Sequence, residues 1–310
     1  MAESIRVFAS ATVANVGCAF DVLGFALSQP GDEIVLRKNN RQEIRILEIT
    51  GDQGRLSLNP LENTATVSIQ AMLQSMEVRQ GFDLTLHKKM PLGSGLGSSA
   101  ASAVGGVFAA NCLLGNPLDP KSLLPFSMEG ERLACGSAHA DNVAPCLLGG
   151  FVLISSYEPL QVHSIPYPSG LRAVVVHPQI EVRTRDARDV LRQKITLKAA
   201  SEQWGRVAGL ISGLHSQNYE LISQSLEDKI VEPARAVLIP GFYRVKQAAY
   251  DSGALGCSIS GSGPSVFALA GPDADTKSLA TAMVKAFGDI GIPANPYISP
   301  IRTEGPVILD

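Results

Sequence analysis

A short segment rich in glycine and serine has the residues expected of a phosphate-binding loop. It reads Pro91-Leu92-Gly93-Ser94-Gly95-Leu96-Gly97-Ser98-Ser99-Ala100. Glycines let backbone N–H groups come close to a phosphate, and a helix that starts after them adds a partial positive charge. The Walker A lysine is missing, and the third glycine has the wrong spacing for the dinucleotide fingerprint. The segment therefore predicts a phosphate loop of neither of these two types.

The residues on both sides of this segment predict a strand before it and a helix after it. Phe82, Leu84 and Leu86 alternate with polar residues, as in a half-buried strand. Small apolar residues are frequent from Ala100 to Gly115, which indicates a buried helix that ends at a glycine. A strand, a loop and a helix in this order aim the start of the helix at a binding site.

A second helix carries a candidate acidic residue, and a proline-marked segment behind it divides the chain. Asp119-Pro120 is a typical helix start, Gly136 is a typical helix end, and Glu131 lies near that end. A short apolar strand follows at residues 151–154, and prolines mark residues 159–168 as a linker. We therefore predict two domains, residues 1–157 and residues 158–310.

The second half of the chain has the pattern of an α+β domain with ferredoxin-like character. Its expected strands cover residues 173–176, 255–259, 266–269 and 297–298, and its expected helical stretches cover residues 185–226 and 276–287. In the first of these helical stretches we expect Trp204, Leu210 and Leu214 to lie in the core. The predicted fold class of the whole chain is α+β, with a first domain that contains a βαβ unit.

The composition favours a small molecule as the binding partner. The 310 residues carry a formal net charge of -3 and a sequence pI of about 6.0, which gives no electrostatic attraction for nucleic acid or for an anionic membrane surface. The sequence has no run of about 18 apolar residues, so we expect a soluble protein without a transmembrane helix. Five cysteines, an odd number, lie far apart, which predicts reduced thiols in a cytoplasmic protein.

Several long motifs are similar to one enzyme superfamily. The segment from Pro91 to Ala100 matches Pro-x-x-x-Gly-Leu-Gly-Ser-Ser-Ala, the signature of the GHMP kinases. Residues 10–24 and 139–150 resemble the homoserine kinases of that superfamily, and the likeness continues at residues 232–242 and 259–265. The resemblance implies a two-domain GHMP kinase fold and the ATP-dependent phosphorylation of the L-homoserine hydroxyl to O-phospho-L-homoserine, in threonine synthesis. It leaves a homodimer open.

The same resemblance assigns residues to ATP, to magnesium and to the acceptor. ATP would bind along the segment from Pro91 to Ala100, with its base or ribose near Asn63 and with Mg²⁺ between Ser98 and Glu131. Homoserine would be bound by Asn15, Asp21, His139, Asn142, Arg188 and Arg235. These residue types suit the ligands, because Mg²⁺ prefers oxygen ligands, a carboxylate attracts an ammonium group, and arginine binds a carboxylate through two parallel hydrogen bonds.

Catalysis is predicted to proceed without a dedicated protein base. Several GHMP kinases use an aspartate as the base, but the homoserine kinases resemble this chain in having an asparagine, Asn142, where that aspartate is expected. The neighbouring Asp141 is expected to point elsewhere. In-line transfer of the γ-phosphoryl group would then depend on positioning and on charge neutralisation.

Three other functions compete with this interpretation. A kinase for mevalonate or shikimate would have no substrate ammonium group to pair with Asp21. A non-catalytic nucleotide-binding relative would be expected to lose Glu131 or the serine pair, and this chain has both. A nicotinamide dehydrogenase is disfavoured by the glycine spacing.

A second glycine motif, Gly261-Ser262-Gly263-Pro264, has two interpretations. Its glycines could bring backbone close to the phosphate loop or to the substrate across the domain interface. The same residues are also typical of a tight turn between two strands. The sequence favours the two interpretations equally.

Overall fold

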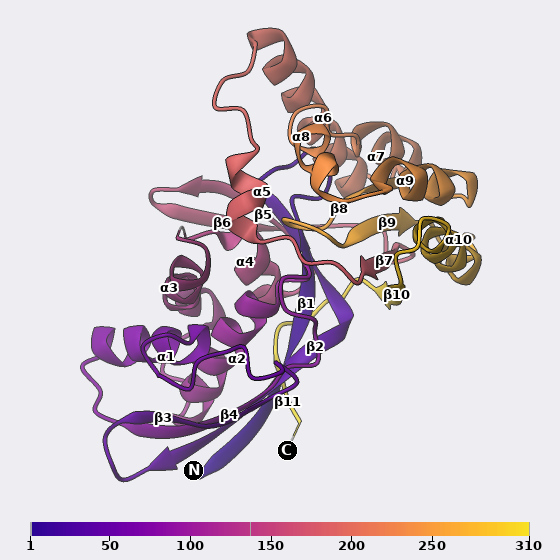
Figure 1. The fold of residues 1–310 in the computed structure, drawn as a ribbon. Helices are drawn as coiled ribbons and strands as arrows, with labels where there is room; N and C mark the ends of the chain where they lie inside the picture. Colours follow the sequence, from indigo (N-terminus) through magenta and orange to yellow (C-terminus); the bar gives the residue numbers. More distant parts are fainter. Residues whose placement is uncertain (1, 137, 310) are drawn as a thin grey trace.

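The computed structural model describes residues 2–136 and 138–309, without the side chains of Cys135 and Thr184, and the strands of these residues form two sheets (Figure 1). The first sheet has the order β11-β1-β2-β4-β3, with β5 paired to β2 and β6 paired to β5. Its strands are β1 (Ser4–Ala14), β2 (Leu23–Asn39), β3 (Ile44–Thr50), β4 (Gly81–His87), β5 (Phe151–Tyr157), β6 (Leu160–Ile165) and β11 (Val307–Ile308). The strands of the second sheet are β7 (Arg172–Pro178), β8 (Gly256–Ile259), β9 (Val266–Ala270) and β10 (Ala294–Pro300).

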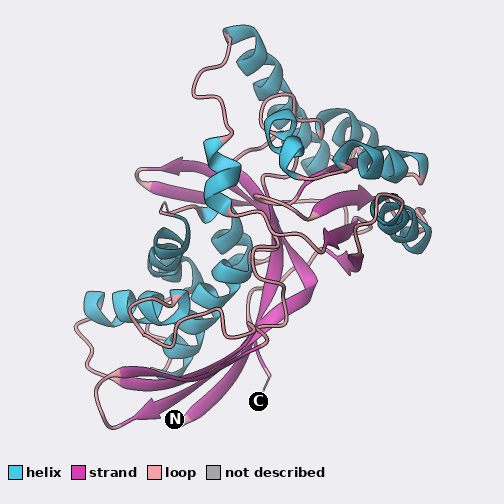
Figure 2. Ribbon diagram, in the orientation of Figure 1, coloured by secondary structure: helices cyan, strands magenta, loops and turns pink. Residues whose placement is uncertain are grey.

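Helices pack on both sheets, and in Figure 2 those of the first half gather on one side of the long strands. The helices of the first half are α1 (Thr64–Ser75), α2 (Ser98–Leu113), η1 (Pro120–Leu123), α3 (Leu124–Cys135) and α4 (Ala140–Leu148). Those of the second half are α5 (Thr184–Asp189), α6 (Leu197–His215), α7 (Tyr219–Ser225), α8 (Glu232–Arg235), η2 (Ala236–Leu238), α9 (Phe242–Asp251) and α10 (Thr276–Gly288). No helix among the described residues combines the length and the apolar character needed to cross a membrane.

The predicted strand, loop and helix around the glycine-serine segment are confirmed. β4 buries its alternate side chains, and α2 begins at Ser98, directly after the third glycine of the segment. Nearly every side chain of α2 is buried, because the helix packs against α1 on one side and against β1 and β2 on the other. Small residues allow these close contacts, as at Gly105, where a Cβ atom would come within 2.3 Å of Ile34. The loop is therefore fixed between two buried elements.

The second sheet confirms the predicted ferredoxin-like arrangement. Its four strands run antiparallel in the order β10-β7-β9-β8, and α10 connects β9 to β10. The predicted strands and the predicted helix at residues 276–287 all occur close to their expected places. The two sheets also share a core, in which the rings of Phe25 and Phe267 lie 6.0 Å apart.

The prediction that Trp204 lies in the core is wrong. Its side chain is 63% exposed, whereas Leu210 and Leu214 are fully buried as predicted. The two leucines are four residues apart on the face of α6 that packs against α7, and Trp204 lies on another face of the helix. The predicted helical stretch is also divided into α5, α6 and α7 by residues 190–196 and 216–218.

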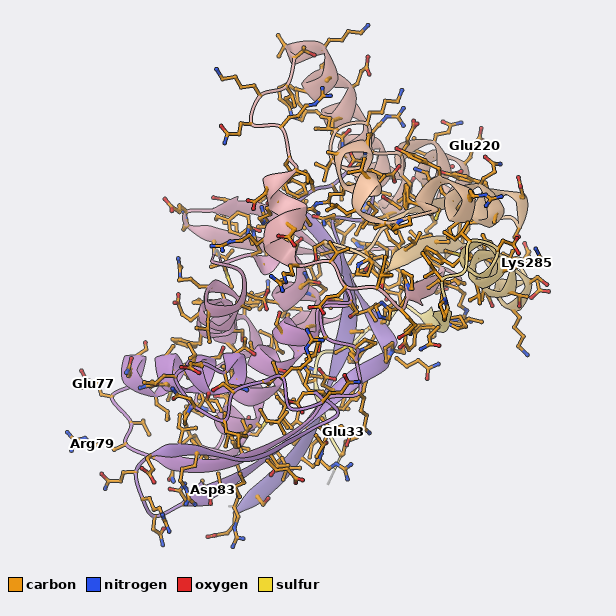
Figure 3. The ribbon with its side chains drawn as sticks, in the orientation of Figure 1. Glu33, Glu77, Arg79, Asp83, Glu220 and Lys285 are labelled. Atoms are coloured by element: carbon orange, nitrogen blue, oxygen red, sulfur yellow. The ribbon has the colours of Figure 1, made fainter. Side chains whose placement is uncertain are left out.

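The change from the first sheet to the second lies between the end of β6 and the start of β7. The predicted division after Tyr157 stays a prediction. β2 extends far enough to reach the second half of the chain, where Leu27 forms a β-bridge with Ile301. Charged side chains such as Glu77, Arg79, Glu220 and Lys285 point outward at the periphery of the molecule (Figure 3). The four described cysteines whose side chains can be assessed, Cys18, Cys112, Cys146 and Cys257, are free thiols, and the side chain of Cys135 lies outside the described residues.

Candidate active site

A cavity of about 480 Å³ brings together most of the residues predicted for ATP, metal and acceptor. The predicted residues that line it are Asn15, Asp21, Asn63, Leu92, Gly93, Ser94, Gly95, Gly97, Ser98, Ser99, Glu131, His139, Asn142, Arg188 and Arg235. Pro91, Leu96 and Ala100 belong to the same loop but do not line the cavity, and the last two are fully buried. The cavity thus joins a phosphate end, at the start of α2, to an acceptor end, where α4 and α5 meet the loop after β1.

The glycines at the phosphate end adopt a backbone conformation that other residues rarely adopt. Gly93, Gly95 and Gly97 have φ angles of 65°, 76° and 70°. A Cβ atom at Gly95 would lie 2.4 Å from the carbonyl oxygen of Ser260, and one at Gly97 would lie 2.1 Å from Thr12 Oγ1. Both close approaches require glycine, so the loop can keep this shape only with glycine at these two positions.

The start of α2 is open to an anion. Gly97 is its N-cap residue, and in the described part of the chain no side chain caps this end. The first backbone hydrogen bond of the helix runs from Ala101 N to Gly97 O, which leaves the N–H groups of Ser98, Ser99 and Ala100 without a partner inside the helix. These N–H groups and the helix dipole together favour negative charge in front of the loop.

The two serines at the start of α2 donate to two different carboxylates. Ser98 Oγ donates to Asp32 Oδ2 at 3.0 Å, and Ser99 Oγ donates to Glu131 Oε1 at 2.6 Å. Ser98 and Glu131 both line the cavity, as their predicted role at a metal requires, but the hydroxyl that contacts Glu131 belongs to Ser99. Among the described residues, no three His, Cys, Asp or Glu side chains gather as a metal site.

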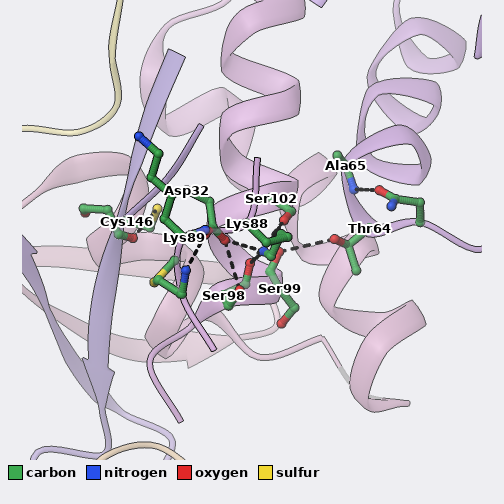
Figure 4. A network of polar contacts seen from close by, with 12 residues as sticks. Asp32, Thr64, Ala65, Lys88, Lys89, Ser98, Ser99, Ser102 and Cys146 are labelled. Carbon is green, nitrogen blue, oxygen red and sulfur yellow. Dashed lines mark hydrogen bonds and ion pairs between the residues drawn. The ribbon is translucent and has the colours of Figure 1, made fainter. Parts of the chain in front are cut away.

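Asn63 lies at the nucleotide side of the cavity with its side-chain oxygen already engaged. It is the N-cap residue of α1 and accepts a hydrogen bond from Ala65 N at 3.0 Å (Figure 4). The hydroxyl of Thr64 donates to the carbonyl of Ser99 at 3.4 Å, so α1 also contacts the first turn of α2. The predicted contact of Asn63 with the base or ribose stays a prediction.

The acceptor end is built around Asp21, which has a positive φ of 59°. Arg188 donates two hydrogen bonds to its carboxylate, at 2.9 Å and 3.3 Å, and His139 Nδ1 lies 3.8 Å from it. Asn15 stabilises the unusual backbone, since its side-chain oxygen accepts from Asp21 N at 3.0 Å. Arg235 is buried beside this group and donates to the carbonyls of Ala187 and Gly261.

Two buried nitrogen atoms at the acceptor end have no hydrogen-bond partner within the described residues. These buried atoms are His139 Nε2 and Arg188 Nε. Burial lowers the pKa of His139, and burial together with the nearby Arg188 lowers the pKa of Arg235 to about 10. The guanidinium groups of Arg188 and Arg235 both lie over the ring of Phe20. Two positive charges in one place favour the binding of an anion, such as a substrate carboxylate.

Asn142 and Asp141 lie at the start of α4, between the two ends of the cavity. Asn142 Oδ1 accepts a hydrogen bond from Thr12 Oγ1 at 2.7 Å, close to Gly97 of the phosphate loop. Asp141 is buried, and burial together with the charge of Asp21 raises the pKa of its carboxyl group to about 7. Asn142 therefore lies near the point where a phosphate and an acceptor would meet.

Sequence reasoning missed some residues that support the site. Tyr157 donates to the carbonyl of Asp21 at 2.9 Å and accepts from Ala140 N at 3.3 Å, so it links the Asp21 loop to α4. Lys88, Asp32 and Ser102 form a buried network behind the phosphate loop (Figure 4). A signal did exist for this network, because Lys88 continues the alternation of Phe82, Leu84 and Leu86, and a lysine on that buried face needs a partner.

Both interpretations of the second glycine motif are confirmed. Residues 261–264 form a turn between β8 and β9, and this turn also lies against the phosphate loop. Ser260 Oγ donates to Gly95 O at 2.7 Å, and Ser265 N donates to Ser94 O at 3.2 Å. The second half of the chain thus holds the phosphate loop in place from its outer side.

Comparisons with known proteins agree along the whole chain. The family model described as the GHMP kinases N terminal domain matches residues 63–150, and the GHMP kinases C terminal model matches residues 209–290. The homoserine kinase of Chlorobium phaeobacteroides (strain BS1) is 48% identical, covering 99% of this chain and 100% of that protein, and the homoserine kinase of Xylella fastidiosa (strain M12) is 37% identical, covering 99% and 95%. The crystal structure of homoserine kinase from Cytophaga hutchinsonii has a TM-score of 0.97 and 56% identity, covering 100% of this chain and 98% of that chain.

Proposed function

The chain belongs to the homoserine kinases of the GHMP kinase family, and on this premise we propose that it transfers the γ-phosphoryl group of ATP to the hydroxyl of L-homoserine. The product is O-phospho-L-homoserine, a precursor in threonine synthesis. One observation carries the proposal, namely that a single cavity joins an uncapped, glycine-bounded helix start to a cluster of one carboxylate and two arginines. A polyphosphate suits the first group, and an amino acid suits the second.

At the phosphate end, the triphosphate is assigned to the loop from Pro91 to Ala100. The free N–H groups at the start of α2 support this assignment, because they can donate to phosphate oxygens without any change of the backbone. Asn63 is assigned to the base or ribose. Ser98 and Glu131 would hold Mg²⁺, which neutralises phosphate charge when it is bound.

At the acceptor end, Asp21 is assigned to the ammonium group of homoserine, and Arg188 and Arg235 are assigned to its carboxylate. The unpartnered nitrogens Arg188 Nε and His139 Nε2 support this assignment, since buried polar atoms without partners are costly until a ligand forms a hydrogen bond with them. Asn15 holds Asp21, and Asn142 and His139 are assigned to the hydroxyl side of the substrate. Mevalonate and shikimate have no ammonium group for Asp21, which disfavours them as acceptors.

The transfer itself is proposed to use no dedicated protein base. The homoserine oxygen attacks the γ-phosphorus in line while the bond to the leaving ADP oxygen breaks. The hydroxyl proton passes to an oxygen of the transferred phosphoryl group, because Asn142 is an amide and is not basic at neutral pH. The main contribution of the protein is to align the hydroxyl with the loop and to balance the phosphate charge.

The proposal is tested by measuring ADP release with Mg-ATP and a panel of homoserine, mevalonate, shikimate and galactose. Turnover of homoserine alone supports the assignment of the acceptor end. Turnover of another member of the panel would support kinase activity but refute the assignment of the acceptor end. A folded, ATP-binding protein that is silent on all four is a non-catalytic relative. A homodimer and a cytoplasmic location stay predictions from the sequence.

A further inference from the structure

A buried ion pair lies directly behind the phosphate loop. It joins Lys88, just after β4, to Asp32 in β2 (Figure 4). The two side chains are 2% and 0% exposed. Burying two charges is expensive, and a protein gains from it only when hydrogen bonds satisfy the remaining groups of the pair. The hydrogen bonds of Lys88 and Asp32 therefore show which groups this ion pair holds in place.

The ammonium group of Lys88 has three donors and three acceptors. It donates to the Asp32 carboxylate, to Ser98 O at 2.8 Å and to Ser102 Oγ at 2.8 Å. Because each donor is already used, Lys88 cannot bind a phosphate directly without giving up one of these bonds. Lys88 also lines the cavity, and its hydrogen bonds to Ser98 and Ser102 connect it to the first turn of α2.

The carboxylate of Asp32 is equally saturated. One oxygen accepts from Lys89 N at 2.8 Å and from Met90 N at 3.0 Å, and the other accepts from Lys88 and from Ser98 Oγ at 3.0 Å. The hydroxyl proton of Ser98 is therefore committed to Asp32, and the hydroxyl can no longer rotate freely. What remains on the Ser98 oxygen is its lone pairs, which can bind a cation but cannot donate.

A neighbouring ion pair shows that this arrangement is not a general feature of the two strands. Glu33 and Lys89 are the next residues along each segment and also form an ion pair, to which Arg6 adds a second cation. Lys89 has a side chain that is 53% exposed, and neither Lys89 nor Glu33 lines the cavity. The outer pair serves as a matched control for the inner one.

We propose that Asp32 and Lys88 are positioning residues that fix the Ser98 hydroxyl as a ligand for the divalent cation of the nucleotide complex. Asp32 holds the proton away from the cation, and Lys88 balances the Asp32 charge so that it does not repel the phosphates. The inference rests on the proposed placement of Mg²⁺ at Ser98. It concerns nucleotide binding only, so it is tested without any acceptor.

The experiment is calorimetric titration of the full chain with ADP, once with Mg²⁺ and once with a chelator. The Ser98→Ala and Asp32→Asn variants are each expected to lose about tenfold in affinity for Mg-ADP, the usual effect of one charge-assisted contact, while their affinity for metal-free ADP changes by less than about threefold. The Lys89→Met control is expected to bind both forms like the wild type. Equal losses with and without Mg²⁺ would mean that the pair is merely structural, and would overturn the proposal.

Two further variants keep the test decisive if Asp32→Asn does not fold. The Asp32→Asn/Lys88→Met double variant replaces the ion pair by neutral groups, which a buried site tolerates better than one unpaired charge. Ser102→Ala removes only one acceptor of Lys88 and is the mildest change. Ser102→Ala is expected to lose affinity for Mg-ADP selectively, by about twofold to threefold. If the ratio of its affinities for Mg-ADP and metal-free ADP equals that of the wild type, the role of Lys88 is refuted. Failure of the proposed function is recognised separately, because it appears as absent homoserine turnover in the wild type.

Discussion

The two ends of the cavity differ in how completely their polar groups are satisfied. At the phosphate end, Asp32 and Lys88 use all of their hydrogen-bonding capacity within the protein. At the acceptor end, His139 and Arg188 each keep a buried nitrogen without a hydrogen-bond partner among the described atoms, and Arg235 has a lowered pKa. The network behind the phosphate loop is thus complete before a ligand arrives, although Ser94 Oγ and the first N–H groups of α2 stay open, whereas the side chains of the acceptor end need their ligand to become complete. Substitutions at the first end should therefore affect nucleotide binding and turnover, and substitutions at the second should affect the recognition of homoserine.

The largest effect is expected from Glu131→Ala at the phosphate end. Loss of the carboxylate that would hold the cation removes charge neutralisation at the transferred phosphoryl group, so kcat should fall by about a thousandfold. Steady-state kinetics with Mg-ATP and homoserine measure it. Glu129→Gln, on the same helix but paired with Arg132 outside the cavity, is the matched control and should keep wild-type activity. A fall confined to KM for homoserine would contradict the distinction between the two ends.

At the acceptor end, Arg188→Met should mainly raise KM for homoserine. The variant removes the bidentate partner of Asp21 and a donor for the substrate carboxylate, and a loss of about a hundredfold in kcat/KM is expected. KM for ATP should stay within about twofold of the wild type. Arg185→Met, an exposed change in the same helix, is the control. A large rise in KM for ATP would show that the two ends are not independent.

Asp141→Asn tests whether a carboxyl group between the two ends is a base or a structural residue. Without a dedicated base, turnover should fall by less than about tenfold, and a thousandfold fall with unchanged substrate affinity would refute that view.

The same variant should also change how stability depends on pH. The pKa of Asp141 is raised to about 7 in the folded chain, so between its ordinary value and pH 7 the folded state binds more protons than the unfolded state. The wild type should therefore lose stability as pH rises through this window, by roughly 2–4 kcal/mol, and the Asn variant should not. Chemical denaturation at pH 5 and pH 8 measures the difference between the two proteins. Parallel losses in both would show that Asp141 titrates normally.

The smallest effect is expected from Tyr157→Phe. Its hydroxyl joins the Asp21 carbonyl to α4, and without it the acceptor residues should be held less firmly, which raises KM for homoserine by about threefold to tenfold. Tyr167→Phe is a suitable control, since the Tyr167 hydroxyl is buried with no partner among the described atoms. Equal changes in KM for the two substitutions would show that the Tyr157 hydroxyl does not support the acceptor site.

Much of the fold follows from local patterns in the sequence, and the error at Trp204 shows the limit of that reasoning. The alternation of Phe82, Leu84 and Leu86 determines which face of β4 is buried, whatever the strand packs against. In α6 the sequence pattern does not determine which face of the helix, or which part of its length, packs against α7. Trp204 lies on a part of α6 that stays exposed.

The candidate site divides in a similar way. Most of the residues assigned to ATP and acceptor lie in continuous motifs, with Asn63 and Arg188 outside them, and most of them line the cavity. Asp32, Lys88 and Tyr157 were missed because their partners are distant in sequence. Lys88 and Asp32 are 56 residues apart, and Tyr157 and Asp21 are 136 residues apart. Only strand register brings such pairs together, and a single sequence does not determine that register.

The contact between the second glycine motif and the phosphate loop also affects how the protein is made. Ser260 and Ser265 hydrogen-bond to Gly95 and Ser94, so the loop is fully supported only when both halves of the chain are present. During synthesis the first half leaves the ribosome long before residue 265 does. A nascent chain that ends within the first half therefore lacks a complete nucleotide site, and ATP can begin to stabilise the protein only when translation is almost finished.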